Sequence, residues 1–408
     1  MTPKLGDVSV HECFGHRSGG KSIAWNSMGT KVASSSSDRT AKIWSVVGEG
    51  KGREVANLCG HTASVEQILW SSEDVIVTSS LDRTLRIWDA RLASLSTSSA
   101  DPVTSSSTSS HSSSSCVARI PLPSAPINID LHPNYAALAV LMEQRERNQE
   151  CNYDLRIYDI RKTNLAAYRK PISNTNVAPS RKSDGATVSA TMASQQLMQT
   201  YLSILPKTSN DKQYEILNQG RFSPFGYHYL AASRNSQDGL GKLHIMDCSD
   251  MTLQRSQHRD DCNENKFFHT LVAHTNSTSC FCFSSCGGFM ATGGSDAIVG
   301  IWEINELTCV RTVDRLVRPV QSLAFSHDSK ILASNSIDDS RIDIADVETG
   351  EKIGDLDSMS RYGAIEMEWN PKGYALALAC YFPENKGSGS YGRHSVAITV
   401  IKCSISNT

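Results

Sequence analysis

The sequence predicts an all-β fold, a seven-bladed β-propeller with long insertions between its strands, on three observations. A ten-residue phrase occurs twice, as SSSDRTAKIW at residues 35–44 and as SSLDRTLRIW at residues 79–88. Seven short segments alternate apolar residues and end just before a turn, as half-buried antiparallel strands do. Seven further segments have the pattern of a blade's third strand, and no segment carries a convincing helical period.

The repeated phrase belongs to a longer register of four residue types. Three copies share a His, a hydroxyl residue, an Asp and a Trp: His16, Ser34, Asp38 and Trp44; His61, Thr78, Asp82 and Trp88; His274, Thr292, Asp296 and Trp302. This register is that of the WD repeat, a four-stranded blade that stacks around a central axis. Because buried polar groups need partners, we expect the Asp to hold the His, the His to reach the hydroxyl, and the hydroxyl to meet the indole N–H. We interpret these residues as structural rather than catalytic.

The blades follow one another along the chain. One apolar-alternating strand of each blade is expected at or near a marker residue: Trp25, Trp70, Leu131, Phe222, Phe283, Phe325 and Trp369. The third strands are expected at AKIWSV, LRIWDA, LRIYDI, KLHIMD, GIWEI, RIDIADV and VAITVIKC. In the sixth unit Ile344, six residues after Asp338, is expected at the Trp position, so that blade should rely on apolar packing. Residues 8–14 are expected to close the ring as the outer strand of the last blade, because closure removes unpaired sheet edges.

The length leaves room for insertions in what we interpret as a single propeller over residues 1–408. Seven blades of about 40 to 45 residues need about 300. The excess is predicted at residues 94–115, a disordered Ser/Thr-rich tract, at residues 162–212, which are partly disordered, and at residues 249–266, which are polar. We interpret the Ser/Thr tract as a spacer, with a phosphorylation platform as the alternative.

Composition excludes several classes of function. The net charge of −2 gives no field that favours nucleic acid or an acidic membrane, and no apolar stretch is long enough to span a bilayer. With no signal-like N-terminus, we expect an intracellular protein whose 12 Cys residues are thiols. The cluster Cys280, Cys282 and Cys286 is expected to pack in the core rather than to bind metal. No catalytic motif is present, so we expect neither an enzyme nor a cofactor.

The C-terminal third resembles one family of WD-repeat proteins. The segments GSDAIVGIWEINELTCVR, RLVRPVQSLAFSHD and RIDIADVETGEK carry the resemblance, which is to the THO complex subunit 3 family. The resemblance implies a nuclear, non-catalytic scaffold of the THO (TREX) complex, which couples transcription to messenger-RNA packaging and export. The implied partners are the other THO subunits, above all the large helical scaffold subunit, and indirectly a DEAD-box RNA helicase, an export adaptor and messenger RNA; no membrane partner is implied.

Partner-binding residues are predicted on the turns that hold the quartet Asp residues. Arg39, Arg83 and Arg318 lie in or beside such turns and are not needed by the quartets. The alternative is a substrate receptor of a cullin-RING ubiquitin ligase, which would use the WDAR box with Trp88, Asp89 and Arg91, or the similar YDIR at residues 158–161. Direct RNA binding by the basic residues of the second insertion is a third possibility, but no aromatic residues are interleaved there.

Overall fold

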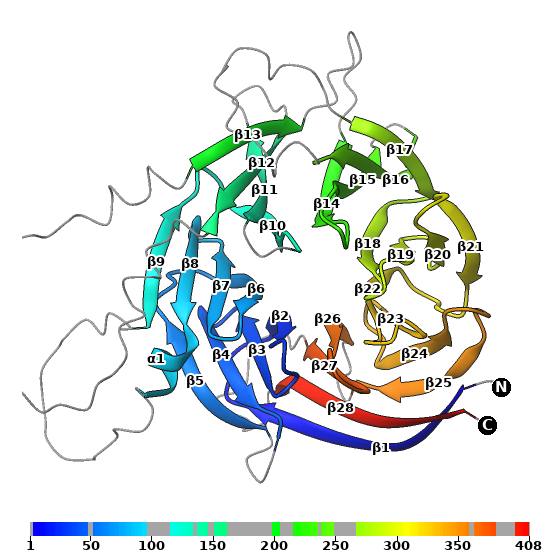
Figure 1. Ribbon diagram of the computed structural model, residues 1–408, viewed down its shortest axis with the longest axis horizontal. Helices are drawn as coiled ribbons and strands as arrows, with labels where there is room; N and C mark the ends of the chain where they lie inside the picture. The colour runs from blue at the N-terminus through cyan, green and yellow to red at the C-terminus, as the bar shows by residue number, and fades with distance from the viewer. Residues whose placement is uncertain are drawn as a thin grey trace, which may run out of the picture.

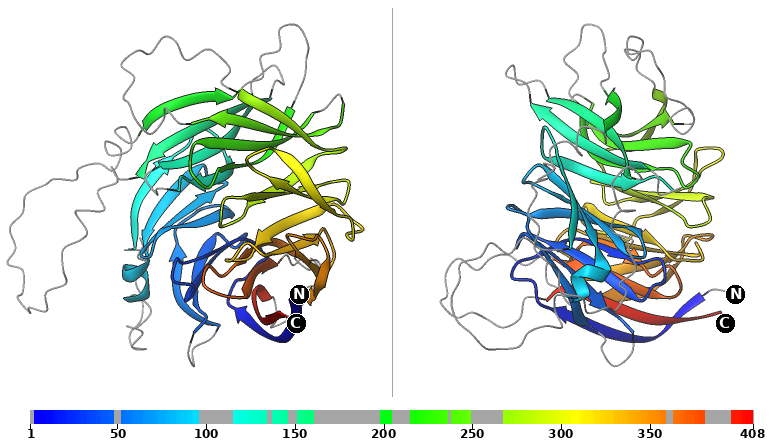
Figure 2. Two further views of the ribbon diagram at one scale, coloured as in Figure 1. Left: turned by 45° about the vertical axis from the view of Figure 1, so that its right-hand side comes forward. Right: turned by 60° about the vertical axis from the view of Figure 1, so that its left-hand side comes forward.

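The computed structural model describes residues 3–47, 52–95, 115–133, 137–145, 151–160, 198–204, 215–235, 238–248, 267–358, 363–380 and 396–407. These residues form seven four-stranded antiparallel sheets arranged around a central axis (Figure 1). The N- and C-terminal ends lie side by side at one edge of the ring, as all views agree (Figure 2). The seven-bladed propeller is therefore the observed fold.

Each blade runs outward from an inner strand. Blade 1 comprises β2 (Gly20–Trp25), β3 (Lys31–Ser36), β4 (Thr40–Ser45) and β5 (Arg53–Cys59). Blade 2 comprises β6 (Val65–Ser72), β7 (Val75–Ser80), β8 (Thr84–Asp89) and β9 (Cys116–Pro121). Blade 3 comprises β10 (Pro126–Leu131), β11 (Ala137–Arg145), β12 (Cys151–Asp159) and β13 (Met198–Ile204). Blade 4 comprises β14 (Glu215–Phe222), β15 (His228–Asn235), β16 (Gly241–Asp247) and β17 (Phe267–His274).

The remaining blades complete the ring. Blade 5 comprises β18 (Thr278–Phe283), β19 (Phe289–Gly294), β20 (Val299–Glu303) and β21 (Thr308–Val313). Blade 6 comprises β22 (Val320–Phe325), β23 (Ile331–Ser336), β24 (Arg341–Asp346) and β25 (Lys352–Asp357). Blade 7 comprises β26 (Ala364–Trp369), β27 (Ala375–Cys380), β28 (Val396–Asn407) and, from the other end of the chain, β1 (Pro3–Phe14). The expected closure by the N-terminal strand is confirmed, since β1 pairs antiparallel with β28.

The apolar core is divided among the seven interfaces between blades. Each of seven clusters of buried side chains draws its members from two adjacent blades. This division follows from the strand period of two, because one face of each sheet packs on the preceding blade and the other on the next. The propeller therefore has no single hydrophobic core, and its stability depends on packing at each of the seven interfaces between blades.

Two features inside or beside the predicted insertions were not expected. A short helix, α1 (Ala90–Leu95), follows β8 and packs its Ala93 into the interface of blades 1 and 2. Strand β13 lies inside the segment predicted as the second insertion and supplies the outer strand of blade 3. Residues 96–114 and 249–266, and the remainder of 162–212, lie outside the described residues. Within the part of the chain that the structure describes, no helix is long and apolar enough to cross a membrane.

The ring has two faces, which antiparallel topology distinguishes. The turns between the second and third strands of a blade, such as residues 37–39, lie on one face, here called the Asp-turn face, together with the loops that enter each inner strand. The turns between the first and second strands, such as residues 26–30, lie on the other, here called the inner-turn face. Residues on the two faces cannot share one binding site on the rim.

Candidate functional site: the faces and seams of the propeller

In blade 1 the quartet forms one continuous chain of hydrogen bonds. The His16 Nδ1 lies 2.9 Å from an Asp38 carboxylate oxygen, and its Nε2 lies 2.9 Å from the Ser34 hydroxyl. The Trp44 indole N–H donates to the same hydroxyl at 2.8 Å. Because the carboxylate can only accept, Nδ1 carries the proton, and the hydroxyl accepts from Trp44 while donating to Nε2. Both ring nitrogens of His16, the Ser34 hydroxyl and the Trp44 indole N–H are thus hydrogen-bonded within the quartet.

The quartets of blades 2 and 5 repeat this arrangement. His61 lies 2.9 Å from Asp82 and 2.8 Å from Thr78, which accepts from Trp88 at 2.8 Å. The corresponding distances around His274 are 3.0 Å to Asp296 and 2.9 Å to Thr292, and Trp302 donates to Thr292 at 2.9 Å. Burial lowers the pKa of both His61 and His274 below the ordinary value, which keeps the rings neutral.

Each quartet Asp also organises the turn that carries it. Asp82 accepts from the backbone N–H of Thr62 and of Thr84 and from the Thr84 hydroxyl. Although its burial acts in the other direction, these bonds and the His61 contact hold the pKa of the Asp82 carboxyl at about 2. The carboxylate is thus fully occupied by structural contacts and is unsuited to act as a general base.

The three predicted partner-binding arginines all lie on the Asp-turn face. Arg39 and Arg83 directly follow Asp38 and Asp82, have positive φ angles of 71° and 60°, and are exposed. Their backbone N–H groups donate to Ser36 and Ser80, which closes the two turns. Arg318 differs, because its guanidinium lies 3.5 Å from a carboxylate oxygen of the equally exposed Asp338.

Blade 6 corrects one expectation about the Trp position. The position equivalent to Trp44 is held by Ala345, not Ile344, because Ala345 pairs with Leu332 as Trp44 pairs with Val32. The turn of blade 6 is one residue longer, so Asp339 rather than Asp338 lies six residues before this position.

A buried ion pair, which the sequence analysis missed, replaces the quartet in this blade. Arg315, from the loop before β22, donates two hydrogen bonds, of 2.9 and 2.7 Å, to Asp343 on β24. This two-pronged pair satisfies a carboxylate that is only 5% exposed. Blade 6 is therefore stabilised by apolar packing and by an ion pair, rather than by apolar packing alone.

A second missed set of residues joins the blades at the inner strands. A polar side chain on one inner strand accepts the backbone N–H of the next: Ser22 from Ile68, Gln67 from Ile129, Asn128 from Gly220, Gln219 from Phe281, Ser322 from Met367 and Glu366 from Ile23. Inner strands have no neighbouring strand on the channel side, so these side chains satisfy amides that would otherwise lack a partner. The signal was present in the sequence as a polar residue at one register position of the inner strands.

Three inner-strand tryptophans add a further link between blades. The indoles of Trp25, Trp70 and Trp369 donate to backbone carbonyls of the preceding blade at 3.0 to 3.1 Å. These bonds tie together blades 6, 7, 1 and 2, which include the blade that closes the ring. Where the aromatic residue near the end of the inner strand is Trp, it thus contributes blade-to-blade hydrogen bonding as well as packing.

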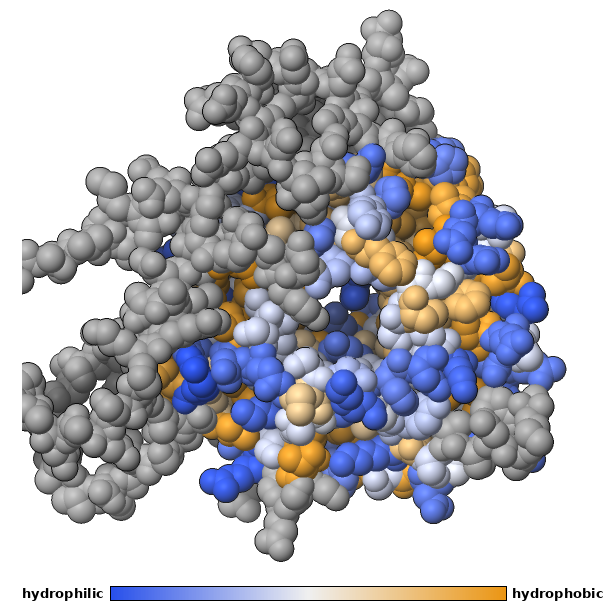
Figure 3. Space-filling model, in the orientation of Figure 1, coloured by the Kyte–Doolittle hydropathy of each residue, from blue (hydrophilic) through white to orange (hydrophobic). Residues whose placement is uncertain are grey.

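The channel side of the inner strands carries a small group of charges. The Arg221 guanidinium of β14 lies 3.9 Å from the Glu366 carboxylate of β26, so side chains from blades 4 and 7 meet across the axis. Burial raises the pKa of Glu368 to about 8 and that of Asp130 to about 6. Figure 3 shows a hollow at the centre of one face, with hydrophilic residues visible inside it. The channel is therefore polar and is bridged by an ion pair.

The residues of the proposed ligase box lie at the inner-turn end of β8. Trp88 is used by the quartet of blade 2. Arg91 donates to both carboxylate oxygens of Asp89 at 3.1 and 2.7 Å, and Asp89 is buried. The guanidinium is therefore engaged within its own motif. Arg161 of the second box lies outside the described residues.

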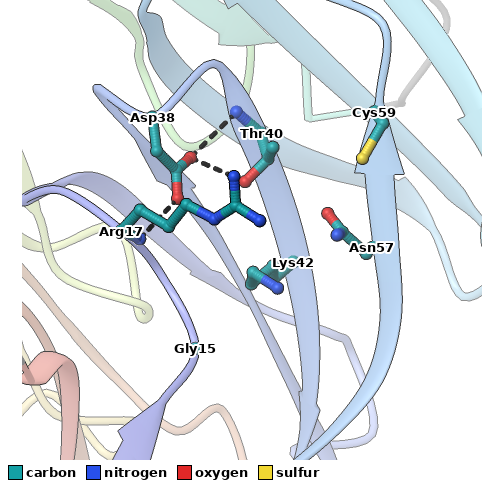
Figure 4. A pocket seen from close by; sticks show the side chains of 7 residues that line it. All are labelled: Gly15, Arg17, Asp38, Thr40, Lys42, Asn57 and Cys59. Atoms are coloured by element: carbon teal, nitrogen blue, oxygen red, sulfur yellow. Dashed lines mark hydrogen bonds between the residues drawn. The ribbon is translucent and has the colours of Figure 1, made fainter. Parts of the chain in front are cut away.

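A hollow of about 220 Å³ lies on blade 1 and is lined by Gly15, Arg17, Asp38, Thr40, Lys42, Asn57 and Cys59 (Figure 4). Asp38 belongs to the quartet, and Lys42 is paired with Glu54 at 2.6 Å. Burial raises the pKa of the Cys59 thiol, so it is not an activated nucleophile. The hollow thus contains no pair of groups arranged for covalent or acid–base catalysis.

The three clustered cysteines do not converge on one point. Cys280 and Cys282 lie on one face of β18 in the interface with blade 6, where burial raises the pKa of Cys280 above the ordinary range. Cys286 lies in the following turn and is exposed, so the expected core packing is wrong for this residue. Among the described residues, no group of three metal-ligating side chains is close enough to hold an ion.

Comparison with known proteins agrees with this geometry. The model of the WD domain, G-beta repeat, matches residues 7–45, 52–89 and 265–303, which contain the three quartets. A solved structure, the β-propeller domain of Cps50 (Swd1) from Myceliophteria thermophila, superposes with a TM-score of 0.63 over 96% of this chain and 99% of that one, at 14% identity. This chain is a seven-bladed WD-repeat β-propeller.

Curated relatives of the propeller include one that matches it nearly end to end. THO complex subunit 3 of Arabidopsis thaliana is 28% identical over 377 residues, which cover 91% of this chain and 90% of the relative. WD repeat-containing protein AAC3 of Dictyostelium discoideum is 22% identical over 346 residues, 79% of this chain and 54% of that protein. These similarities support a scaffold role for the propeller.

Proposed function

We propose that this propeller is a non-catalytic scaffold subunit of a THO-type complex, which acts in the nucleus in the packaging and export of messenger RNA. The observation that carries the proposal is the similarity to THO complex subunit 3, because it extends over 91% of this chain and 90% of the relative. The match to the WD repeat-containing protein AAC3 covers less of both proteins, 79% of this chain and 54% of that one. The partners are then other THO subunits, with the large helical scaffold subunit as the direct one; a DEAD-box RNA helicase, an export adaptor and messenger RNA are reached through the assembly.

The geometry of the described residues fits a scaffold. The Asp and His side chains of the quartets are engaged in structural hydrogen bonds, and the hollow on blade 1 lacks a catalytic pair. Function is therefore expected from binding at the exposed surface of the propeller. We assign the THO contact to the Asp-turn face around Arg39, Arg83 and Arg318, because exposed arginines on rigid turns are favoured in interface cores.

The test is affinity purification of the tagged full-length protein, with mass spectrometry of what it retains. The parent is expected to recover THO subunits, and a triple change of Arg39, Arg83 and Arg318 to Glu is expected to lose most of them. Glu keeps a Cβ at both positive-φ positions, so turn strain is unchanged and the thermal stability of the variant should match the parent. Retention of THO subunits by the variant at parental levels would refute the assigned face.

The same purification separates the alternative function. A substrate receptor of a cullin-RING ubiquitin ligase would recover an adaptor propeller and no THO subunits. In that case Arg91→Ala, which removes the box arginine, should abolish recovery of the adaptor. The bidentate contact of Arg91 with Asp89 argues against this outcome, because a ligase adaptor would have to compete with Asp89 for two of the guanidinium's donors.

A further inference from the structure

The third strands of blades 1, 2 and 3 carry a basic residue at one common register position. Lys42, Arg86 and Arg156 each lie two residues before an aromatic residue and pair with the second strand at equivalent positions. In blade 1 the Lys42 ammonium lies 2.6 Å from the Glu54 carboxylate, and in blade 3 the Arg156 Nε lies 2.8 Å from Asp154. The basic side chain is therefore neutralised by an acid of its own blade in blades 1 and 3.

Blade 2 lacks the carboxylate that neutralises this position in blade 1. Glu54 is the outer-strand residue that pairs with Trp44, whereas the residue that pairs with Trp88 is Cys116. Burial raises the pKa of the Cys116 thiol, so this side chain carries no negative charge at neutral pH. Arg86 thus has a neutral thiol beside it in place of a carboxylate.

A second arginine lies directly opposite the first. Arg119 of β9 pairs with Arg86 of β8, so the two side chains project from the same face of the sheet, where like charges are destabilising. Burial lowers the pKa of His61, and the positive charges of the two arginines lower it further. Among the described residues no carboxylate forms an ion pair with either guanidinium, and Asp82 of the adjoining turn is occupied by quartet and turn contacts. Two positive charges therefore lie side by side without a carboxylate partner.

The two arginines differ in how firmly they are held. Arg86 donates from Nη2 to the Gly60 carbonyl at 2.7 Å, and its guanidinium carbon lies 5.8 Å from the centroid of the Trp88 ring, within cation–π range. The Nε–H of Arg86 is buried and has no acceptor among the described residues. Arg119 is exposed on β9, the outermost strand of its blade, at the rim of the ring (Figure 1). The pair thus combines one arginine that is held in place with one that is open to solvent.

We propose that Arg86 and Arg119 bind the phosphate group of a phosphorylated Ser or Thr in an extended segment of a partner protein. A phosphate monoester carries about 1.5 to 2 negative charges at neutral pH and has three acceptor oxygens, so it can neutralise both guanidiniums. A carboxylate carries a single charge and would leave one arginine uncompensated. Planar guanidinium groups bind phosphate oxygens two at a time, which adds geometric specificity. The site does not use Arg39, Arg83 or Arg318, so it does not depend on the proposed THO contact.

A phosphorylated protein segment fits the pair better than a small phosphate compound or single-stranded RNA. Small-molecule sites are concave and enclose most of their ligand, whereas Arg119 is exposed on the rim. Single-stranded RNA is bound by a track of many cations beside aromatic side chains on which the bases stack. Trp88, the aromatic residue in contact with Arg86, is fully buried and donates to Thr78. One phosphate group displayed on a protein chain matches two adjacent arginines.

The test uses the purified full-length protein and two libraries of peptides of about twelve residues, roughly 40 Å when extended, which differ only in a central phosphoserine or serine. Retained peptides are identified by mass spectrometry. One retained phosphopeptide and its unphosphorylated form are then synthesised, and their affinities are measured by fluorescence polarisation.

The affinities are compared for the parent, Arg119→Gln, Arg119→Glu, Arg86→Gln and a control, Arg341→Gln/Lys352→Gln. The control removes two exposed basic residues of blade 6, each of which pairs with an aspartate, at 3.3 and 2.6 Å. It therefore matches the loss of positive charge but removes bases that already have an acidic partner.

The parent is expected to bind the phosphopeptide about tenfold or more tightly than the unphosphorylated form, and the control should keep this preference. Loss of either arginine should remove most of the preference. Arg119→Glu supplies the carboxylate that blade 2 lacks, so it should abolish the preference without lowering the melting temperature. This variant keeps the test decisive even if Arg86→Gln folds poorly.

Equal affinity of the parent for the two peptide forms, or a parental preference in Arg119→Glu, would overturn the proposal. Displacement of the phosphopeptide by an equal concentration of inorganic phosphate would overturn the protein segment as the ligand. Binding of a labelled oligouridylate that depends on Arg119, with no preference for phosphopeptides, would overturn the proposal in favour of RNA.

Discussion

Removal of one quartet carboxylate tests whether these polar chains stabilise the blades. The change is Asp82→Ala, in a side chain that is 3% exposed and accepts from the His61 ring, two backbone amides and the Thr84 hydroxyl. Thr62 is exposed, so water can satisfy its amide after the change, whereas His61 and Thr84 are buried. The His61 ring N–H and the Thr84 amide and hydroxyl lose their acceptor, and a buried donor without a partner costs about 1 to 3 kcal/mol. Because the Thr84 hydroxyl lies 3.4 Å from the His61 Nδ1 and can accept from it, we expect a net loss of about 2 to 4 kcal/mol in the free energy of unfolding.

The assay is thermal unfolding followed by circular dichroism, with urea unfolding as a second measure. At about 2 °C per kcal/mol for a large domain, the melting temperature should fall by about 4 to 8 °C. Asp338→Asn is the control, because Asp338 lies in the equivalent turn of blade 6, is 57% exposed, pairs with the equally exposed Arg318, and has a positive φ of 53° that Asn tolerates. A variant Asp82→Ala that melts within about a degree of the parent would refute the structural role of the quartet.

The difference between parent and variant should also depend on pH. The folded pKa of Asp82, about 2, is below the ordinary value of about 4. A depressed carboxyl pKa contributes stability that is complete above the unfolded value and is lost as pH falls through the folded one. The melting temperatures of the two proteins should therefore converge as pH is lowered from about 4 towards about 2. A gap that stays constant over this interval would show that the carboxylate charge is not the stabilising feature.

Three further expectations concern the channel-side carboxyl Glu368, the closure of the ring and the ion pair of blade 6. Burial raises the folded pKa of Glu368 to about 8, above the ordinary carboxyl value of about 4. The contribution of protonated Glu368 to the free energy of unfolding is therefore complete below about pH 4 and is lost as the pH rises to about 8. Glu368→Gln should raise the melting temperature more at pH 8 than at pH 5. Equal shifts at both pH values would contradict the burial of an ionisable carboxyl. Deletion of residues 1–14 removes β1 and exposes the edge of β28, so light scattering should detect association, and an unchanged monomer would count against closure by pairing. Arg315→Met leaves the buried Asp343 unpaired and should lower the free energy of unfolding in urea by about 2 to 3 kcal/mol. Adding Asp343→Leu should restore most of this loss. A double variant no more stable than Arg315→Met alone would rule out the ion pair as the cause.

Repetition made most of the architecture predictable. In the sequence, each blade has alternating apolar residues followed by turn residues, and these patterns recur at a nearly constant spacing. Such local patterns indicate strands without reference to any tertiary contact. The positions of Trp25, Phe325 and Trp369 at inner-strand ends, and the pairing of the N-terminal strand with β28, were predictable in this way. The quartets were predictable because four polar residue types in one register have few ways to satisfy each other.

Local irregularity limited the prediction in two places. Counting six residues from Asp338 placed Ile344 at the Trp position of blade 6. The turn of blade 6 has one additional residue, so Ala345 occupies that position instead. In blade 3 the outer strand, β13, follows a long interval and has a weak apolar pattern, so it was counted with the insertion. A spacing argument cannot place a residue across a turn whose length has changed, whereas sheet pairing can.

The sequence by itself determined the number of blades, their order, the closing strand and the buried quartets, because these depend on residues close in the chain or on a repeated register. Only the tertiary structure decided which polar residues join the blades. Glu366 accepts the amide of Ile23 from 343 residues away, and Arg221 meets Glu366 from the far side of the channel. Those contacts exist only once the ring has closed, since closure is what brings the first and last inner strands and the opposite walls of the channel together.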